Sequence, residues 1–284
     1  MIIGSCISLQ FGAALATSLF GSLGPWGVTT LRLSIAGIIL AIVTRPRLRS
    51  WSRGQWRSVA ALGVVLGGMN GSFYMAIAHI PLGTAVAIEF LGPLLLSAGL
   101  SRRRADAAWV ALAMAGMALL GVESIVGKES LDPIGVAFAL IAGAFWVGYI
   151  LCGARVGQHV PGNGGLAMAL AIAAVCVLSV GGAAAVHAVT DLRVLGVAIA
   201  TALLASVIPY TLELGALRRL PRHVFGILLS LEPIVAALAG WLLLHQSIGP
   251  LRLAAIFLVI VASIGGTATA HAGEVTQKPE TSAT

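Results

Sequence analysis

Ten apolar runs, each about twenty residues long, follow one another through almost the whole chain of 284 residues. A bilayer core about 30 Å thick needs roughly 20 apolar residues per crossing helix, so each run is long enough to span a membrane. The runs lie at about residues 2–20, 25–44, 58–79, 81–100, 107–123, 133–152, 164–187, 192–215, 221–243 and 248–271. The pattern predicts an all-α polytopic membrane protein with ten transmembrane helices.

Composition excludes the other broad classes of protein. Hydrophobic residues make up 58% of the chain and charged residues 10%, whereas a soluble domain carries roughly 25% charged residues. Intrinsic disorder is excluded because it requires low hydrophobicity and high charge. The first run begins close to Met1 but lacks a basic stretch before it, so we expect a retained helix rather than a signal peptide.

The distribution of basic residues predicts the orientation in the membrane. Of the 17 lysines and arginines, thirteen lie in the tail or in loops that follow the even-numbered runs, and three lie in loops on the other side. Lysine and arginine accumulate in cytoplasmic loops, so both termini are predicted to be cytoplasmic. The net charge of +7 therefore reflects topology beside a lipid bilayer, and we expect no nucleic-acid partner.

A pair of prolines indicates an internal repeat. Pro81 and Pro93 frame the fourth run, and Pro221 and Pro233 frame the ninth with the same spacing. Because five spans is an odd number, a second copy would enter the membrane from the opposite side, as in secondary transporters whose substrate site lies near the midplane. We predict two inverted five-helix repeats, with a chance recurrence of the spacing as the alternative. The predicted boundaries are 1–125 for the first repeat, 130–272 for the second and 273–284 for a disordered cytoplasmic tail.

Four charged residues lie deep inside predicted spans: Glu89, Glu213, Glu232 and Arg32. A charge at this depth costs about 2.5–3.5 kcal/mol and marks a functional site by default. An arginine can hold a substrate carboxylate with two hydrogen bonds, and a buried carboxyl group can exchange protons near neutral pH. A central cavity for a molecule of both charges is therefore predicted. Three alternatives stay open: Arg32 pairs with a glutamate as a structural strut, it extends to the membrane surface, or Glu213 meets the arginines after its span.

Backbone acceptors and uncharged polar residues accompany these charges. Pro93 lacks the N–H that would bond the carbonyl of Glu89, and Pro209 leaves the carbonyl of Ala205 free in the same way. Weaker candidates for the site are polar or aromatic side chains within the spans, which often only bond neighbouring helices. These are Gln10, Asn70, Tyr74, Trp146 and Tyr210.

Two further patterns bear on packing and on chemistry. Gly63, Gly67 and Gly71 recur at four-residue spacing, which predicts close approach between helices. The sequence contains no HExxH, GxSxG or phosphate-loop motif and no histidine pair with metal-ligand spacing. We therefore expect neither an enzyme nor a metal or other cofactor.

Several segments together carry a resemblance to a known family. They are SLQFGAALATSLF (8–20), GVTTLRL (27–33), GGMNGSFY (67–74), PLGTAVAIEFLGPL (81–94), IPYTLELGALRRLP (208–221) and FGILLSLEP (225–233). With them the chain resembles the drug/metabolite transporter superfamily with two EamA-type repeats, and within it the threonine/homoserine exporter group of bacterial inner membranes, over about residues 5–270.

The resemblance implies ten helices around a central cavity and export of small amino acids, with exchange for protons. Glu89, Glu213, Glu232 and Arg32 all fall inside the matching segments. An exporter of another metabolite or drug on the same fold is the alternative, because related transporters carry different substrates on similar helices. A non-transporting scaffold or an intramembrane lipid enzyme is disfavoured by the repeat and by the missing catalytic motifs. The sequence leaves the oligomeric state open.

Overall fold

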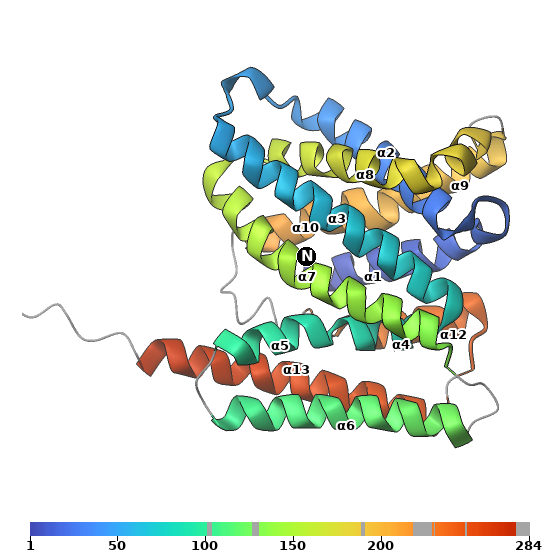
Figure 1. The fold of residues 1–284 in the computed structure, drawn as a ribbon, viewed down its shortest axis with the longest axis vertical. Helices are drawn as coiled ribbons and strands as arrows, with labels where there is room; N and C mark the ends of the chain where they lie inside the picture. The colour runs from blue at the N-terminus through green and yellow to red at the C-terminus, as the bar shows by residue number, and fades with distance from the viewer. Residues whose placement is uncertain are drawn as a thin grey trace, which may run out of the picture.

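The computed structural model of the chain describes residues 1–100, 104–126, 131–188, 191–217, 229, 231–247 and 249–276, and every regular element in these ranges is helical (Figure 1). The helices are α1 (Ile2–Thr17), α2 (Phe20–Thr44), α3 (Arg53–His79), α4 (Leu82–Glu89), α5 (Leu91–Leu100), α6 (Arg104–Val126), α7 (Pro133–His159), α8 (Gly164–Ala188), α9 (Leu192–Ala202), η2 (Leu203–Val207), α10 (Ile208–Leu217), α12 (Glu232–Leu244) and α13 (Pro250–Thr276), with a 3-10 turn η1 (Leu48–Ser50).

These helices fall on the ten predicted spans, which confirms the all-helical membrane architecture. Five are long and apolar enough to cross a membrane: α2, α3, α7, α8 and the continuous segment from α9 to α10. The tail differs from the prediction, because α13 continues to Thr276 and residues 273–276 are therefore helical. Residues 277–284 and the first part of the ninth span, 221–228, lie outside the described residues.

Three spans are interrupted, and a proline lies next to each interruption. The fourth span breaks at Phe90 between α4 and α5, three residues before Pro93. In the ninth, α12 begins at Glu232 with Pro233 in its first turn. The eighth contains η2, a short π-helix that ends two residues before Pro209. A proline removes a helical hydrogen bond, so the prolines account for the places where the regular helix is interrupted. Short π-helices such as η2 are also frequent at functional sites.

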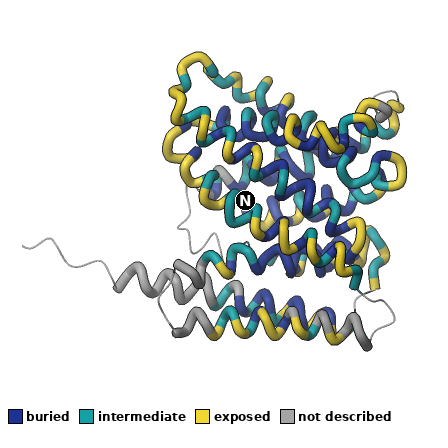
Figure 2. The backbone as a smooth tube through the Cα atoms, viewed as in Figure 1, coloured by how far each residue is buried: buried dark blue, intermediate teal, exposed yellow. Residues whose placement is uncertain are grey.

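The helices pack as antiparallel and crossed pairs around α1. In Figure 1, α2 and α8 lie together at one end of the molecule and α6 and α13 at the other, and α3 packs along both α7 and α8. Between these groups, α1 contacts α10, α12, α9 and η2, and α4 packs on α12. Buried backbone concentrates along these contacts, whereas outward-facing turns are exposed (Figure 2). The polar residues of α1 therefore lie in the interior.

The four-residue glycine spacing brings helices into close contact, as predicted. A Cβ atom on Gly63 would lie 2.7 Å from the Cβ atom of Ile172 in α8, and one on Gly67 would lie 3.1 Å from the carbonyl oxygen of Ala173. Gly71 has a different neighbour, because the space beside it holds the ring of Trp26 in α2. Glycine at these positions thus allows α3 to pack against α8 and α2 at short distance.

Candidate substrate site

Arg32 is the centre of a buried polar network and is 1% exposed. From α2, its Nη1 donates a hydrogen bond of 2.8 Å to the carbonyl oxygen of Ala205 in η2, and its Nη2 donates to Oδ1 of Asn70 in α3. Its guanidinium carbon lies 4.6 Å from the centre of the Tyr74 ring, which is a cation–π contact. All three partners are neutral groups.

Helix chemistry explains why the Ala205 carbonyl is available. In a regular helix this oxygen would accept the N–H of residue 209, but Pro209 has none. The carbonyl is therefore free to accept Arg32, as the sequence predicts. Gly12 of α1 packs directly over this point, since a Cβ atom on it would lie 2.6 Å from the nitrogen of Ala205. The π-helical turn thus brings a backbone acceptor, an arginine and α1 together.

The two structural alternatives for Arg32 do not hold. At 1% exposure, its side chain does not extend to the surface. Among the described residues, no carboxylate lies within ion-pair distance of it, so it is not half of a salt-bridge strut. Its Nε is also buried without a hydrogen-bond partner. A buried charge without a counter-charge is costly, so this site favours the arrival of an anionic group.

Asn70 and Tyr210 extend the network to two further helices. The Nδ2 of Asn70 donates to the carbonyl oxygen of Leu66 at 2.8 Å and lies 3.2 Å from the Tyr210 hydroxyl in α10. The Tyr210 ring lies 6.2 Å from the ring of Tyr149 in α7. Sequence reasoning missed Tyr149, although a tyrosine within an apolar span was the available signal. Four helices therefore hold this network in place.

Two of the buried glutamates are bound by side chains of α1. Ser5 Oγ donates to Oε1 of Glu213 at 2.7 Å, and Gln10 Nε2 donates to Oε1 of Glu232 at 3.0 Å. Both carboxyl groups belong to residues that are less than 9% exposed. Ser5 was not predicted from the sequence, because a serine in an apolar run carries no distinctive signal. The arginines that Glu213 was alternatively expected to meet lie outside the described residues.

Glu89 completes an acidic cluster at the end of α4. It is 7% exposed, and its carboxyl group lies close enough to that of Glu232 for the two charges to repel, as do those of Glu232 and Glu213. The Glu89 carbonyl, freed by Pro93, faces α7 closely: a Cβ atom on Gly143 would lie 2.7 Å from it. The cluster can therefore hold cations or protons.

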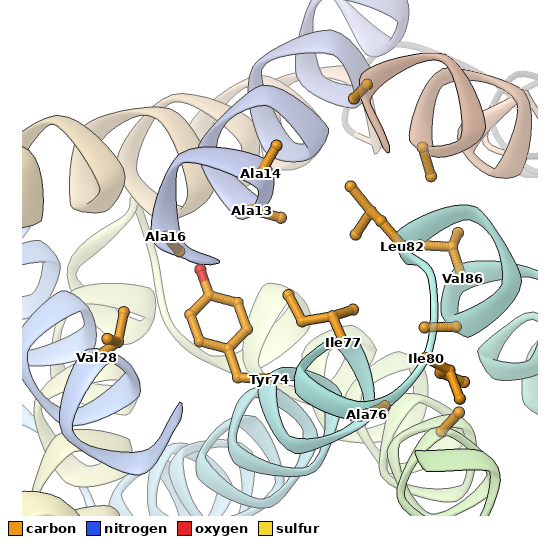
Figure 3. Close-up of a cluster of buried hydrophobic side chains, with 14 of the residues drawn as sticks. Ala13, Ala14, Ala16, Val28, Tyr74, Ala76, Ile77, Ile80, Leu82 and Val86 are labelled. Carbon is orange, nitrogen blue, oxygen red and sulfur yellow. The ribbon is translucent and has the colours of Figure 1, made fainter. Parts of the chain in front are cut away.

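Tyr74 and Trp146 have different surroundings within this interior. Figure 3 shows the Tyr74 hydroxyl pointing from α3 toward Ala16 of α1, and this buried oxygen has no hydrogen-bond partner. The Trp146 ring packs edge-on against Phe90, with ring centres 4.8 Å apart. The structure therefore places Trp146 in apolar packing at the helix break and Tyr74 beside Arg32.

Tyr210 lies within electrostatic range of both the positive and the negative groups. The phenol of Tyr210 interacts with the charges of Arg32, Glu213 and Glu89. Helix α1 contacts both η2, which binds Arg32, and α12, which carries Glu232. Interrupted helices that present free backbone groups and buried charges inside an all-helical membrane protein are the architecture of secondary transporters.

Comparison with known proteins agrees with this class. The chain belongs to the EamA-like transporter family, which matches residues 133–266. It is 41% identical over 265 residues to the threonine/homoserine exporter RhtA of Escherichia coli K12, covering 92% of this chain and 88% of that protein. The RhtA protein of Salmonella typhimurium LT2 is 40% identical over the same length.

Two further comparisons concern more distant proteins. An uncharacterized protein of Pseudomonas aeruginosa, PA1977, is 31% identical over 255 residues, with 83% of this chain and 81% of that protein covered. A crystal structure of a protein 22% identical to this chain superimposes with a TM-score of 0.62, covering 96% of this chain and 97% of the other. The shared fold therefore extends over almost the entire chain.

Proposed function

We propose that this protein exports small zwitterionic amino acids, similar to threonine and homoserine, from the cytoplasm across the bacterial inner membrane in exchange for protons. The observation that carries the proposal is the buried guanidinium of Arg32, which has only neutral partners among the described residues. The names of the relatives from Escherichia coli and Salmonella typhimurium support the choice of substrate.

The arrangement divides the work between two groups of side chains. Arg32 binds the substrate carboxylate, because a guanidinium offers paired N–H donors that match the two oxygens of a carboxylate. Asn70 and Tyr74 hold the guanidinium in place. On the other side of the site, Glu89 and Glu232 bind the ammonium group or protons in turn. Because one carboxylate cannot bind a proton and the substrate ammonium group at the same time, the substrate is exchanged for protons.

The helix contacts support two inverted repeats with boundaries 1–125 and 130–272. Counterpart spans pair with each other in three places: α2 with α8, α4 with α12, and α6 with α13. The pairing of α3 with α7 has its counterpart in α1 against α9 and α10. Each repeat also breaks a helix just before an equivalent proline, Pro93 or Pro233. With the asymmetric distribution of basic residues, this arrangement supports cytoplasmic termini and a site between the repeats.

Efflux measurements test the proposal. Everted vesicles from an overexpressing strain are given labelled threonine or homoserine, with and without an imposed pH gradient. We expect gradient-driven accumulation of both amino acids. Movement of neither substrate would refute the substrate assignment, whereas movement that ignores the gradient would refute proton exchange.

Two glutamate variants test the proton coupling. Glu89→Gln and Glu232→Gln remove a titratable group at nearly constant volume, so we expect loss of gradient-driven transport in at least one of them. Asp191→Asn is the matched control, because Asp191 is exposed and caps α9 far from the cluster. Full gradient-driven transport in both glutamate variants would show that the acidic cluster does not carry the protons.

A further inference from the structure

The connection between α2 and α3 carries a dense group of arginines on an exposed surface at the edge of the molecule (Figure 1, Figure 2). With one exposed arginine near the end of α7 they form what we call the basic patch: Arg45, Arg47, Arg49, Arg53, Arg57 and Arg155. No aspartate or glutamate occurs in residues 45–57, or in residues 153–165 at the connection from α7 to α8. The patch is therefore strongly positive.

The side chains of the basic patch are not neutralised by the rest of the described chain. None of the six makes an ion pair or a hydrogen bond with another described residue. An exposed guanidinium of this kind keeps its N–H donors available to a ligand. An anion that arrives from outside the chain can therefore be bound by more than one arginine.

Hydrogen bonds fix the backbone that carries these arginines. Both the N–H and the hydroxyl group of Ser50 donate to the carbonyl of Arg47, at 3.1 and 2.7 Å. Gln55 takes part in the capping box at the start of α3, and its Nε2 donates to the carbonyl of His159 at the end of α7, at 2.6 Å. Arg155 precedes His159 by four residues and so lies on the same face of α7. The connection from α2 to α3 and the end of α7 therefore contribute to one surface.

Two tryptophans lie among the arginines. Trp51 and Trp56 are half-buried, with ring centres 5.2 Å apart. Trp51 and Pro46 both contact the start of α8, since a Cβ atom on Gly164 would lie 3.6 Å from the Trp51 ring and 2.8 Å from the Pro46 side chain. Tryptophan is favoured at the level of the lipid headgroups, and the connection joins two helices long and apolar enough to cross a membrane, α2 and α3. We therefore expect the basic patch at the depth of the lipid phosphates.

The chemistry of the basic patch selects a phosphate group. A guanidinium offers two parallel N–H donors that match the oxygens of a phosphate, and clusters of about four to eight basic residues at the cytoplasmic end of a membrane-spanning helix are typical of binding to anionic lipid headgroups. We propose that the basic patch binds the phosphate of an anionic phospholipid, in the leaflet that the distribution of basic residues predicts to be cytoplasmic. The bound lipid holds the connection between the two helices that carry Arg32 and Asn70.

Native mass spectrometry of the purified full-length chain tests the proposal without requiring transport. Protein in a neutral detergent is titrated with dioleoyl-phosphatidylglycerol or with dioleoyl-phosphatidylcholine, which has the same acyl chains but no net charge. We expect the first molecule of phosphatidylglycerol to bind about tenfold more tightly than the first molecule of phosphatidylcholine, or tighter still, because each basic residue near a lipid surface strengthens binding of an anionic lipid about fivefold. Equal affinity for the two lipids would overturn the proposal.

Two double variants of equal charge locate the site. Arg47→Gln/Arg49→Gln should weaken binding of phosphatidylglycerol about tenfold or more, with binding of phosphatidylcholine unchanged. Arg218→Gln/Arg219→Gln removes the same charge from another connection on the same predicted side and should leave both affinities unchanged, whereas equal weakening by the two double variants would show that net charge, rather than the basic patch, attracts the lipid. Glycerophosphoglycerol has the same headgroup without acyl chains and should not displace the lipid at equal concentration. Displacement would assign the patch to a soluble phosphodiester and overturn the lipid as its ligand.

Discussion

At the scale of single residues, Arg32 combines burial with the lack of a carboxylate partner among the described residues. If it binds the substrate carboxylate, Arg32→Gln should lower kcat/KM for threonine efflux by about one to two orders of magnitude, since a hydrogen bond to a charged group contributes about 1.5–3 kcal/mol. The kcat/KM of Arg32→Lys should lie between those of the wild type and of Arg32→Gln, because an ammonium group keeps the charge but cannot offer the planar pair of donors. Initial rates over a range of substrate concentrations measure this.

The control for this experiment is an arginine outside the network. Arg193→Gln removes the same charge from the exposed start of α9 and should leave kcat/KM unchanged. A similar loss in both variants would point to net charge rather than to substrate binding. A kcat/KM equal to that of the wild type in Arg32→Gln would show that Arg32 does not bind the substrate.

The contacts of the charged residues could be predicted only in part from the sequence. Depth in the membrane follows from position within an apolar run, and the free carbonyl of Ala205 follows from Pro209. The bonds from Ser5 to Glu213 and from Gln10 to Glu232 do not follow. They join residues more than 200 positions apart, and the rotation of each helix about its axis depends on packing against its neighbours, which hydropathy does not encode.

At the scale of helices, the crossing of α3 and α8 depends on small residues. Gly63→Ala places a Cβ atom 2.7 Å from the Ile172 side chain and 2.8 Å from the carbonyl oxygen of Ala169. The helices must then move apart, so we expect a loss of about 1–3 kcal/mol in unfolding free energy. Gly153→Ala in α7 is the control, because nothing lies within 4 Å of its added Cβ atom. Unfolding of both variants in mild detergent compares them, and equal stability would contradict close packing at Gly63.

A second contact between helices lies at the end of α3. His79 Nδ1 lies 2.7 Å from Oδ2 of Asp132, whose Oδ1 accepts the backbone N–H of Ile134 at the start of α7. The hydrogen bond from the Ile134 N–H lowers the pKa of Asp132 below its ordinary value, and the contact with His79 lowers it further. A carboxyl group whose pKa is lower in the folded than in the unfolded state stabilises the fold at pH values above the unfolded-state pKa, about 3.9 for aspartate. This stabilisation is lost as the pH falls through the folded-state pKa.

The sign of this pH dependence can be tested with two variants. As the pH is lowered below about 4, the range in which an aspartate begins to protonate, the unfolding temperature of the wild type should fall more steeply than that of Asp132→Asn. Asp132→Ala should be less stable than Asp132→Asn at neutral pH, because asparagine still caps α7. Parallel pH curves for the wild type and Asp132→Asn would show that the carboxylate does not contribute.

Helix boundaries were easier to predict than helix interruptions. The run from about 133 to 152 corresponds to α7, which continues to His159, so polar residues at its end extend the helix beyond the apolar segment. The prolines predict where the fourth and eighth spans lose hydrogen bonds. They do not predict that one span breaks at Phe90 whereas the other forms the π-helical η2, because this depends on which neighbour accepts or fills the disturbed turn.

At the scale of the whole molecule, the polar network and the acidic cluster each draw on both of the predicted repeats. Arg32 is held by α2, α3 and η2, which belong to both predicted repeats. The acidic cluster also includes both, since Glu89 lies in the first and Glu232 in the second. If the protein exchanges amino acids for protons as proposed, a relative movement of the repeats would change the positive and negative groups together and so couple substrate release to protonation.

The proposed direction of transport, export from the cytoplasm, requires the topology that the basic residues predict. Cysteines at Ser50, in the arginine-rich connection between α2 and α3, and at Leu192, at the start of α9, are both at exposed positions. They should lie on opposite sides of the membrane, because five spans, an odd number, separate the two connections. A membrane-impermeant maleimide should label Leu192→Cys in intact cells and Ser50→Cys only after permeabilisation. The reverse pattern would place both termini outside, and the proposed direction of export would then have to be inverted, whereas labelling of both in intact cells would contradict the number of spans between them.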